Sequence, residues 1–502
     1  MATPCFPTLG EVAKSLFDHA SLLARKGEHS DNFFDEKKKK SFQTSLARLA
    51  KEDGDFNHNL TTIIHQFLDC IHQISPDTRI CLAIDESIHE VFEQYRHLIR
   101  NEGTCLSKKD TIHWLLRARF IDSIVLSTQK NKLRFNIKDT CLITPNKPYW
   151  FLPIMSEGTV VWPLASSLKW AYTLANTSQS RFHYPDESPQ YDSYRQSQNL
   201  QNASKWLNNK KLPNWGSIYS NISESLNALQ SCNNPNYQRN IDEQYRQSIL
   251  WVLFISRLTT SIGKAIEKQY GRAYLANLIE HYIIQDKLLN SEAKTLEAIV
   301  ECTLNEANIS DPKIANTLWY DFIPKLWRFT SNKCYQAARE IQPLIINNKI
   351  QDEIPTDLKH KLIDQYGEYA ISLINRNLKI QNKQKLPRMF PELYFKGDDL
   401  RKQTSISLND INEFQSLVKK EQLQDEFQWL IDWIKATHLC QSEKYPEALH
   451  HYQKSFEICR YAAGQRQYDL VNEYIAICSK TDQTKKRQKA ITWAKYLGIK
   501  TG

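Results

Sequence analysis

Glycine is the residue whose scarcity most restricts the fold of this chain. It holds 13 glycines in 502 residues, under 3%, whereas soluble proteins average about 7%. Doubly wound sheets and loops that cradle phosphates need glycine at their tight turns. Hydrophobic residues make up an ordinary 41% of the chain. The composition therefore predicts an all-α protein, long enough for about two to four domains.

Apolar spacing predicts helices along most of the sequence. Ile63, Ile64, Phe67 and Ile71 recur every three or four residues, as on one face of a helix. The stretch 133–137 alternates like a short strand, and prolines follow it. We predict a multi-domain helical array with a small β-hairpin or extended loop near 130–160 and a C-terminal helical-repeat region. The expected parts are an N-terminal helical domain (1–125), a β/loop connector (126–163), a unit at 164–230 with an exposed insertion at 184–197, a central helical domain (242–380), a linker (381–407) and the repeat region (408–502).

Charge and cysteine usage restrict the partners and the compartment. The formal net charge of +9 permits binding to a polyanion without requiring it. None of the eleven cysteines forms a C-x-x-C pair or a zinc-binding spacing, which is typical of reduced thiols. The N-terminus lacks a signal-peptide pattern, and the longest apolar run, 249–255, is too short to span a bilayer. We expect a cytoplasmic protein without a membrane partner.

The segment Ser204–Asn214 (SKWLNNKKLPN) combines a helix end with a pair of cations. Asn209 stands where a left-handed residue would end the helix, and asparagine tolerates that conformation well. Lys210 and Lys211 would project from the turn, and Pro213 would begin the next element. This arrangement suits holding a helix against a phosphate backbone. The alternative is a helical hairpin with two solvated lysines.

Residues 168–182 resemble the opening of a lambda-repressor-like (XRE-type) helix-turn-helix. In that family a Ser-Gln pair begins the second helix, and Ser178 and Gln179 occupy that place. The recognition helix would be about 199–207, and the closing helix 218–229. The insertion at 184–197 separates the second and third helices, where the family has a tight turn. The resemblance covers about an eighth of the chain.

The helix-turn-helix resemblance implies double-stranded DNA as a partner and a bacterial origin. A recognition helix reads base edges in the major groove, where Asn and Gln form paired hydrogen bonds with adenine. Lysine and arginine contact phosphates and make binding sensitive to salt. The implied DNA-binding residues are Ser178, Gln179, Arg181, Asn199, Gln201, Asn202, Lys205, Asn208, Lys210 and Lys211.

Residues 443–458 are similar to the second helix of a tetratricopeptide repeat. Ala448 takes the small-residue position at which paired helices approach closely, and Ala436 stands where the first helix usually has glycine. The patterns at 468–478 and 485–497 would supply another pair of helices. The resemblance implies a concave surface for a protein partner, at residues that the sequence does not identify. A plain helical bundle is the alternative. The other signature positions are held by Tyr445, Tyr452 and Ser455.

No catalytic motif occurs: the chain lacks an NTP-binding loop, an H-E-x-x-H pair and a G-x-S-x-G elbow. We therefore predict no catalytic residue, no metal and no cofactor. His65 and His72 with Asp69 could serve a metal or acid–base site, but ordinary core or surface histidines are the alternative. The same alternatives hold for His89 beside Asp85 and Glu86.

Four aromatic residues near the predicted hairpin suggest a second way to bind nucleic acid. Such rings stack on the bases of a single strand, whereas tryptophans in helical proteins also fill gaps between helices. The four residues are Tyr149, Trp150, Phe151 and Trp162.

The sequence leaves three functions open. The first is a non-enzymatic DNA-binding or DNA-associated protein, a regulator or complex component, that docks a protein partner through its helical repeats. The second is a scaffold that binds only protein and keeps a vestigial helix-turn-helix. The third is a metal-dependent, nuclease-like enzyme with a dispersed site.

Overall fold

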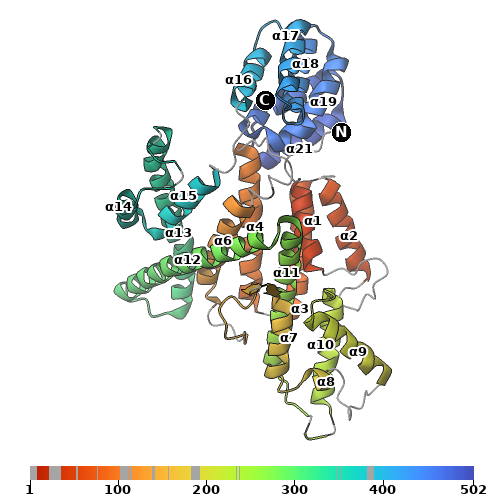
Figure 1. Cartoon of the computed structure of the whole chain (residues 1–502), viewed down its shortest axis with the longest axis vertical. Coiled ribbons are helices and arrows are strands. Elements are labelled where there is room, and N and C mark those ends of the chain that lie inside the picture. Colours follow the sequence, from red (N-terminus) through yellow and green to blue (C-terminus); the bar gives the residue numbers. More distant parts are fainter. Residues whose placement is uncertain are drawn as a thin grey trace.

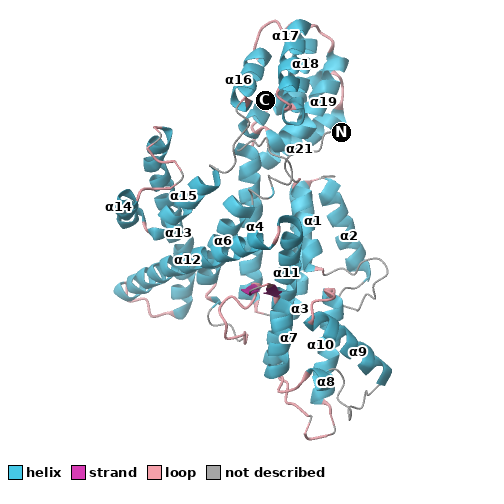
Figure 2. Cartoon of the chain, in the orientation of Figure 1, coloured by secondary structure: helices cyan, strands magenta, loops and turns pink. Residues whose placement is uncertain are grey.

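The computed structural model is all-α apart from one small β-hairpin, which confirms the predicted fold class (Figure 2). The structure describes residues 8–21, 36–51, 55–75, 77–101, 112, 116–137, 142–156, 158–182, 193–232, 234–236, 238–347, 349–351, 353–381 and 389–501.

Consecutive helices of the N-terminal part pack against one another and bury their apolar side chains between them (Figure 1). The first helix starts at a capping box, in which the Thr8 hydroxyl accepts from the Glu11 amide and the Glu11 carboxylate accepts from the Thr8 amide. The predicted stripe of Ile63, Ile64 and Ile71 is fully buried. The elements are α1 (Leu9–Ala20), α2 (Glu36–Lys51), α3 (Phe56–Ile74), α4 (Thr78–Asn101), the π-helical η1 (Leu116–Phe120) and α6 (Ile121–Arg134).

A short antiparallel hairpin leads into the next group of helices. Its two strands, β1 (Ile154–Ser156) and β2 (Thr159–Val161), place Met155 opposite Val160. Proline in the first turn of the following helix suits that position, because no intrahelical partner exists there for an amide. The helices are α7 (Pro163–Leu174), α8 (Gln179–Phe182), α9 (Ser193–Leu207), α10 (Trp215–Gln230) and α11 (Glu243–Tyr270).

The central helices form an arm that projects from the rest of the molecule (Figure 1). Gly271, with a φ of 91°, makes the turn between α11 and α12 that few other residues could make. Two small cores, centred on Trp327 and Ile371, hold the arm together. Its elements are α12 (Arg272–Glu306), α13 (Pro312–Ile346), α14 (Thr356–Tyr366) and α15 (Glu368–Gln381).

The C-terminal helices form successive antiparallel pairs. Ser407 and Asp410 form a capping box at the start of the second helix. The elements are α16 (Phe390–Arg401), α17 (Leu408–Lys420), α18 (Gln424–Gln441), α19 (Tyr445–Ala462), the 3₁₀ turn η3 (Gly464–Arg466), α20 (Gln467–Lys480) and α21 (Thr484–Leu497).

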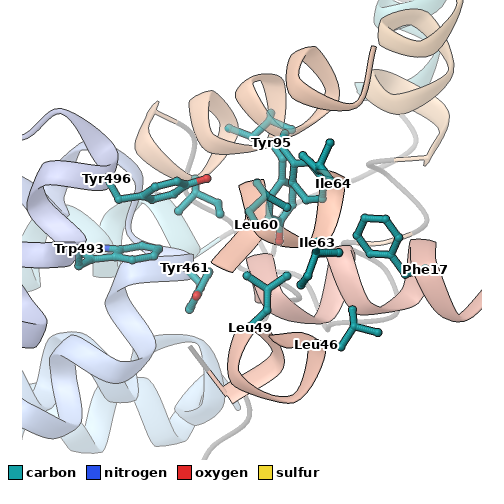
Figure 3. Packing of buried hydrophobic residues seen from close by; sticks show 14 of the residues in the cluster. Phe17, Leu46, Leu49, Leu60, Ile63, Ile64, Tyr95, Tyr461, Trp493 and Tyr496 are labelled. Carbon is teal, nitrogen blue, oxygen red and sulfur yellow. The ribbon is translucent and has the colours of Figure 1, made fainter. Parts of the chain in front are cut away.

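The two ends of the chain share one apolar core. Tyr461 and Trp493 of the C-terminal pairs lie opposite Leu49 and Tyr95 of the N-terminal helices (Figure 3). A hydrogen bond also joins the two ends: the Gln467 side chain donates to the backbone carbonyl of residue 99 in α4 at 2.7 Å. The last helical pair is therefore covered by α4.

Two local expectations from the sequence are wrong. The segment 133–137 is no strand, because α6 continues through Arg134 and a left-handed Asn136 follows it. Five alternating residues are too few to distinguish a strand from a buried helix end. The linker expected at 381–407 contains α16, which tolerates Pro391 in its first turn. Of the insertion expected at 184–197, residues 193–197 belong to α9, and positions 184–192 lie outside the described residues.

Helix α11 is long and apolar enough, by length and composition alone, to cross a membrane. Half of its most apolar window is buried inside the protein, and it packs against α1, α3, α7, α10 and α12. This is the environment of a core helix.

Candidate nucleic-acid interface

Helices α7 to α11 form a compact unit with α9 on its outer edge (Figure 1). The ring of Phe182, just after the Ser-Gln pair, packs against Tyr172 with centroids 5.1 Å apart. Trp215 packs edge-on against Phe254 at 5.1 Å. Trp206 lies on the inner face of α9, where only 4% of its surface is exposed. These aromatic contacts hold the helices of the unit against one another.

The side chains of α9 divide between an inner apolar face and an outer polar face. Ala203 and Trp206 are buried, whereas Gln201, Lys205 and Asn208 are exposed. The exposed three are spaced by four and three residues, so they form one stripe along the helix. Asn199 and Asn202, also predicted to contact DNA, are half-buried beside this stripe.

The turn after α9 has the geometry expected from the sequence. Asn209 is left-handed, with a φ of 57°. Its amide donates to the Trp206 carbonyl at 3.1 Å, and the Lys210 amide donates to the Lys205 carbonyl at 2.9 Å. This pair of hydrogen bonds is a Schellman motif, which ends a helix by satisfying its last carbonyls.

Two cationic side chains of α11 donate hydrogen bonds to the backbone of this turn and of the segment that follows it. The Lys264 ammonium donates to the Asn209 carbonyl at 3.1 Å. The Arg257 guanidinium, only 5% exposed, donates to the Pro213 carbonyl at 2.9 Å. Neither residue was predicted from the sequence. The available signal was that they are the two charged residues within the stretch 247–266 of α11, where a buried charge requires a partner.

Lys205, Lys210 and Lys211 are exposed, and none has an ion-pair partner among the residues that the structure describes. Lys205 thus places one unneutralised cation within the polar stripe, and Lys210 and Lys211 follow the stripe at its C-terminal end. A helix C-terminus carries partial negative charge, so the lysines also stabilise α9 itself.

The remaining predicted contacts lie at the start of α8. Ser178 and Arg181 are exposed, whereas Gln179 is half-buried. The Ser178 and Ser180 hydroxyls are 3.1 Å apart and form a hydrogen bond. The chain between α8 and α9 lies outside the described residues. Helix α8 packs against α7, α9 and α10, and this packing places Ser178, Gln179 and Arg181 in the same unit as the α9 stripe.

The four aromatic residues considered for single-strand stacking separate into two places. Trp162 is buried under the ammonium of Lys264, which lies 5.7 Å from its ring centroid. Tyr149, Trp150 and Phe151 are half-buried and pack edge-on against one another. Only these three remain near a surface that a ligand reaches.

The C-terminal helical pairs repeat the same turn three times. Gln422, Glu443 and Asp482 each take the left-handed conformation, with φ of 58°, 57° and 52°. Ala436 and Ala448 are fully buried between α18 and α19, where their small size permits close approach. The Tyr452 hydroxyl donates to Glu473 of α20 at 2.9 Å, and the Ser455 hydroxyl donates to the α18 backbone at 2.7 Å. Tyr445 lies under the Lys480 ammonium at 4.6 Å.

The histidines that the sequence suggested for a metal or acid–base site lie on two different helices. His65, Asp69 and His72 are exposed along one face of α3. His89 and Asp85 pair locally on α4 at 3.1 Å. In the described ranges, no group of three His, Cys, Asp or Glu side chains could hold a metal ion.

A buried ionic network that the sequence did not indicate joins α6, α12 and α15. The Asp122 carboxylate lies 2.7 Å from His281 Nε2 and accepts from the Arg376 guanidinium at 2.9 Å. Burial lowers the pKa of His281, while its hydrogen bond with Asp122 acts in the opposite direction. The network fixes the arm to the N-terminal helices.

No protein-family model, curated protein or solved structure matches this chain.

Proposed function

We propose that the protein binds duplex DNA with the outer face of α9 and docks a protein partner on its C-terminal helical pairs. One observation carries the DNA-binding part: the exposed stripe of Gln201, Lys205 and Asn208 continues into Lys210 and Lys211. A helix of this kind fits the major groove, where amide side chains read base edges. The lysines that follow contact phosphates and release counterions from the duplex.

The rigidity of the turn supports this proposal. A phosphate-binding lysine contributes most when its backbone is already fixed, because less conformational freedom is lost on binding. The Schellman motif at Asn209 and the hydrogen bonds from Lys264 and Arg257 fix the backbone that carries Lys210 and Lys211. The inner anchor Trp206 holds the helix itself.

The protein partner is proposed to dock at the α16–α17 end of the C-terminal pairs. The opposite end is covered by α4. At the open end, Phe395 is 60% exposed and Leu408 is 63% exposed. We propose these two side chains as apolar contacts for the partner. A cytoplasmic location is part of the proposal, supported by free thiols at every cysteine in the described residues.

A charge-reversal experiment tests the DNA-binding part. Binding of the full-length protein to labelled duplex is measured by gel shift and anisotropy, for the wild type and for Lys210→Glu with Lys211→Glu. We expect the double variant to bind about tenfold more weakly or worse. The matched control is Lys419→Glu with Lys420→Glu, an exposed lysine pair at the end of α17 before the same left-handed turn. Equal weakening in both variants, or no duplex binding by the wild type, would contradict the proposal.

A further inference from the structure

A groove of about 1200 Å³ opens between α7, α12 and the proline-rich segment before the hairpin. Its volume exceeds the roughly 300–1,000 Å³ of most small-molecule pockets. Aromatic and aliphatic side chains form most of its wall. They include Tyr149, Trp150, Trp170, Tyr245, Ile154 and Ile284.

The aromatic side of the groove is held rigidly. Tyr149 is left-handed with a φ of 58°, a conformation that costs a bulky residue about 1–2 kcal/mol. Its hydroxyl donates to the Asp286 carboxylate at 3.0 Å, and the other oxygen of Asp286 accepts from Gln129 at 2.6 Å. The Trp150 ring rests edge-on against Phe151 at 5.6 Å. Backbone strain that the surrounding structure maintains is characteristic of binding sites.

The groove is exposed as well as apolar. Ile154 and Ile284 are 48% and 44% exposed, among the more exposed large apolar side chains of the described chain. The cations Lys147 and Lys287 are exposed among its lining residues, and so is the carboxylate of Glu280. Aromatic and aliphatic walls with flanking cations match a ligand that carries flat rings joined by negative charges.

The position of the groove connects it to the proposed duplex interface. Helix α7 packs against α9, and Ser167, Trp170 and Leu174 of the same helix line the groove. Helix α7 thus contributes to both regions, as the support of α9 and as one wall of the groove.

We propose that this groove binds unpaired bases of a DNA strand. The rings of Trp150, Trp170 and Tyr245 stack on the bases, and Lys147 and Lys287 contact the adjoining phosphates. The choice of a DNA strand rests on the proposed function, whereas stacking and charge follow from the groove itself. An apolar protein segment is the competing occupant, but it would leave the two lysines without a partner of opposite charge.

The test uses full-length protein and a labelled oligothymidylate of about 12 nucleotides, within the usual range of single-strand site sizes. We expect Trp150→Ala to weaken binding roughly fivefold or more, and Lys287→Glu to weaken it in a salt-dependent manner. Glu280→Gln should strengthen binding, because it removes the one carboxylate that lines the groove among the residues the structure describes. The matched control is Phe329→Ala, which removes a 68% exposed ring from α13, outside the groove.

Two further measurements separate the possible outcomes. Lys210→Glu with Lys211→Glu should retain most oligothymidylate binding while losing duplex binding, so the two sites fail independently. Unchanged oligothymidylate binding by both Trp150→Ala and Lys287→Glu would overturn the groove proposal. The same holds if Trp150→Ala abolishes binding of an apolar dye and leaves oligothymidylate binding intact, since the groove would then serve an apolar partner. A wild type that binds oligothymidylate through these residues but never duplex overturns the proposed function alone.

Discussion

The ammonium of Lys264 donates a hydrogen bond to the backbone carbonyl of Asn209 and so joins α11 to the end of α9. The same ammonium lies over the ring of Trp162. Burial lowers the pKa of Lys264, and the nearby Glu267 carboxylate acts in the opposite direction. A cation next to the last carbonyls of a helix is favourable, because those carbonyls carry the negative end of the helix dipole.

Lys264→Met should weaken DNA binding without removing a DNA contact. The hydrogen bond to Asn209 is lost, and the turn that carries Lys210 and Lys211 becomes less restricted. We expect duplex affinity to fall several-fold and the free energy of unfolding to fall by about 1 kcal/mol. Titration with labelled duplex and urea denaturation measure the two effects. Lys268→Met, an exposed lysine one turn further along α11, should change neither. Identical affinities for both variants would mean that the turn does not need this support.

The nature of the turn was predictable from local sequence, but its support was not. Asparagine followed by two lysines and a proline indicates a left-handed helix end on residue chemistry alone, and Asn209 has that conformation. Lys264 lies 55 residues away, and no local pattern connects the two. The Asp122–His281 contact spans 159 residues and was missed for the same reason. Local propensity predicted the helices, whereas pairings between distant charges depend on tertiary packing.

The left-handed position of Asn209 predicts opposite effects for two small substitutions. Asn209→Gly should leave the free energy of unfolding unchanged or raise it slightly, because glycine adopts positive φ without strain. Asn209→Ala should lower it by about 1 kcal/mol. Urea denaturation of the two variants measures the difference. If alanine is tolerated as well as glycine, the turn is not left-handed in solution.

The salt dependence of duplex binding reports how many phosphate contacts the lysine pair makes. The slope of log K against log salt is about −0.9 per phosphate contact on B-DNA. Lys210→Glu with Lys211→Glu should therefore make the slope shallower by about 2. The Lys419→Glu, Lys420→Glu control should retain the wild-type slope. A lower affinity with an unchanged slope would indicate that the lysines act by stabilising α9 rather than by contacting phosphates.

The Asp122–His281–Arg376 network predicts a pH-dependent stability. His281 is 8% exposed, and its burial together with the charges of Arg376 and Arg117 lowers its pKa, against the influence of Asp122. The unfolded chain therefore binds a proton at a higher pH than the folded protein does. It follows that the free energy of unfolding decreases as pH falls below about 6.5, toward the lower pKa of the folded state.

His281→Gln tests this dependence, because glutamine retains a donor for Asp122 and cannot titrate. We expect the variant to lose less stability than the wild type when pH falls from about 7 to about 5. His360→Gln is the matched control, since His360 is exposed on α14 and should leave the pH profile unchanged. Urea denaturation across this range gives the profiles. Parallel profiles for the wild type and His281→Gln would exclude His281 as the titrating group.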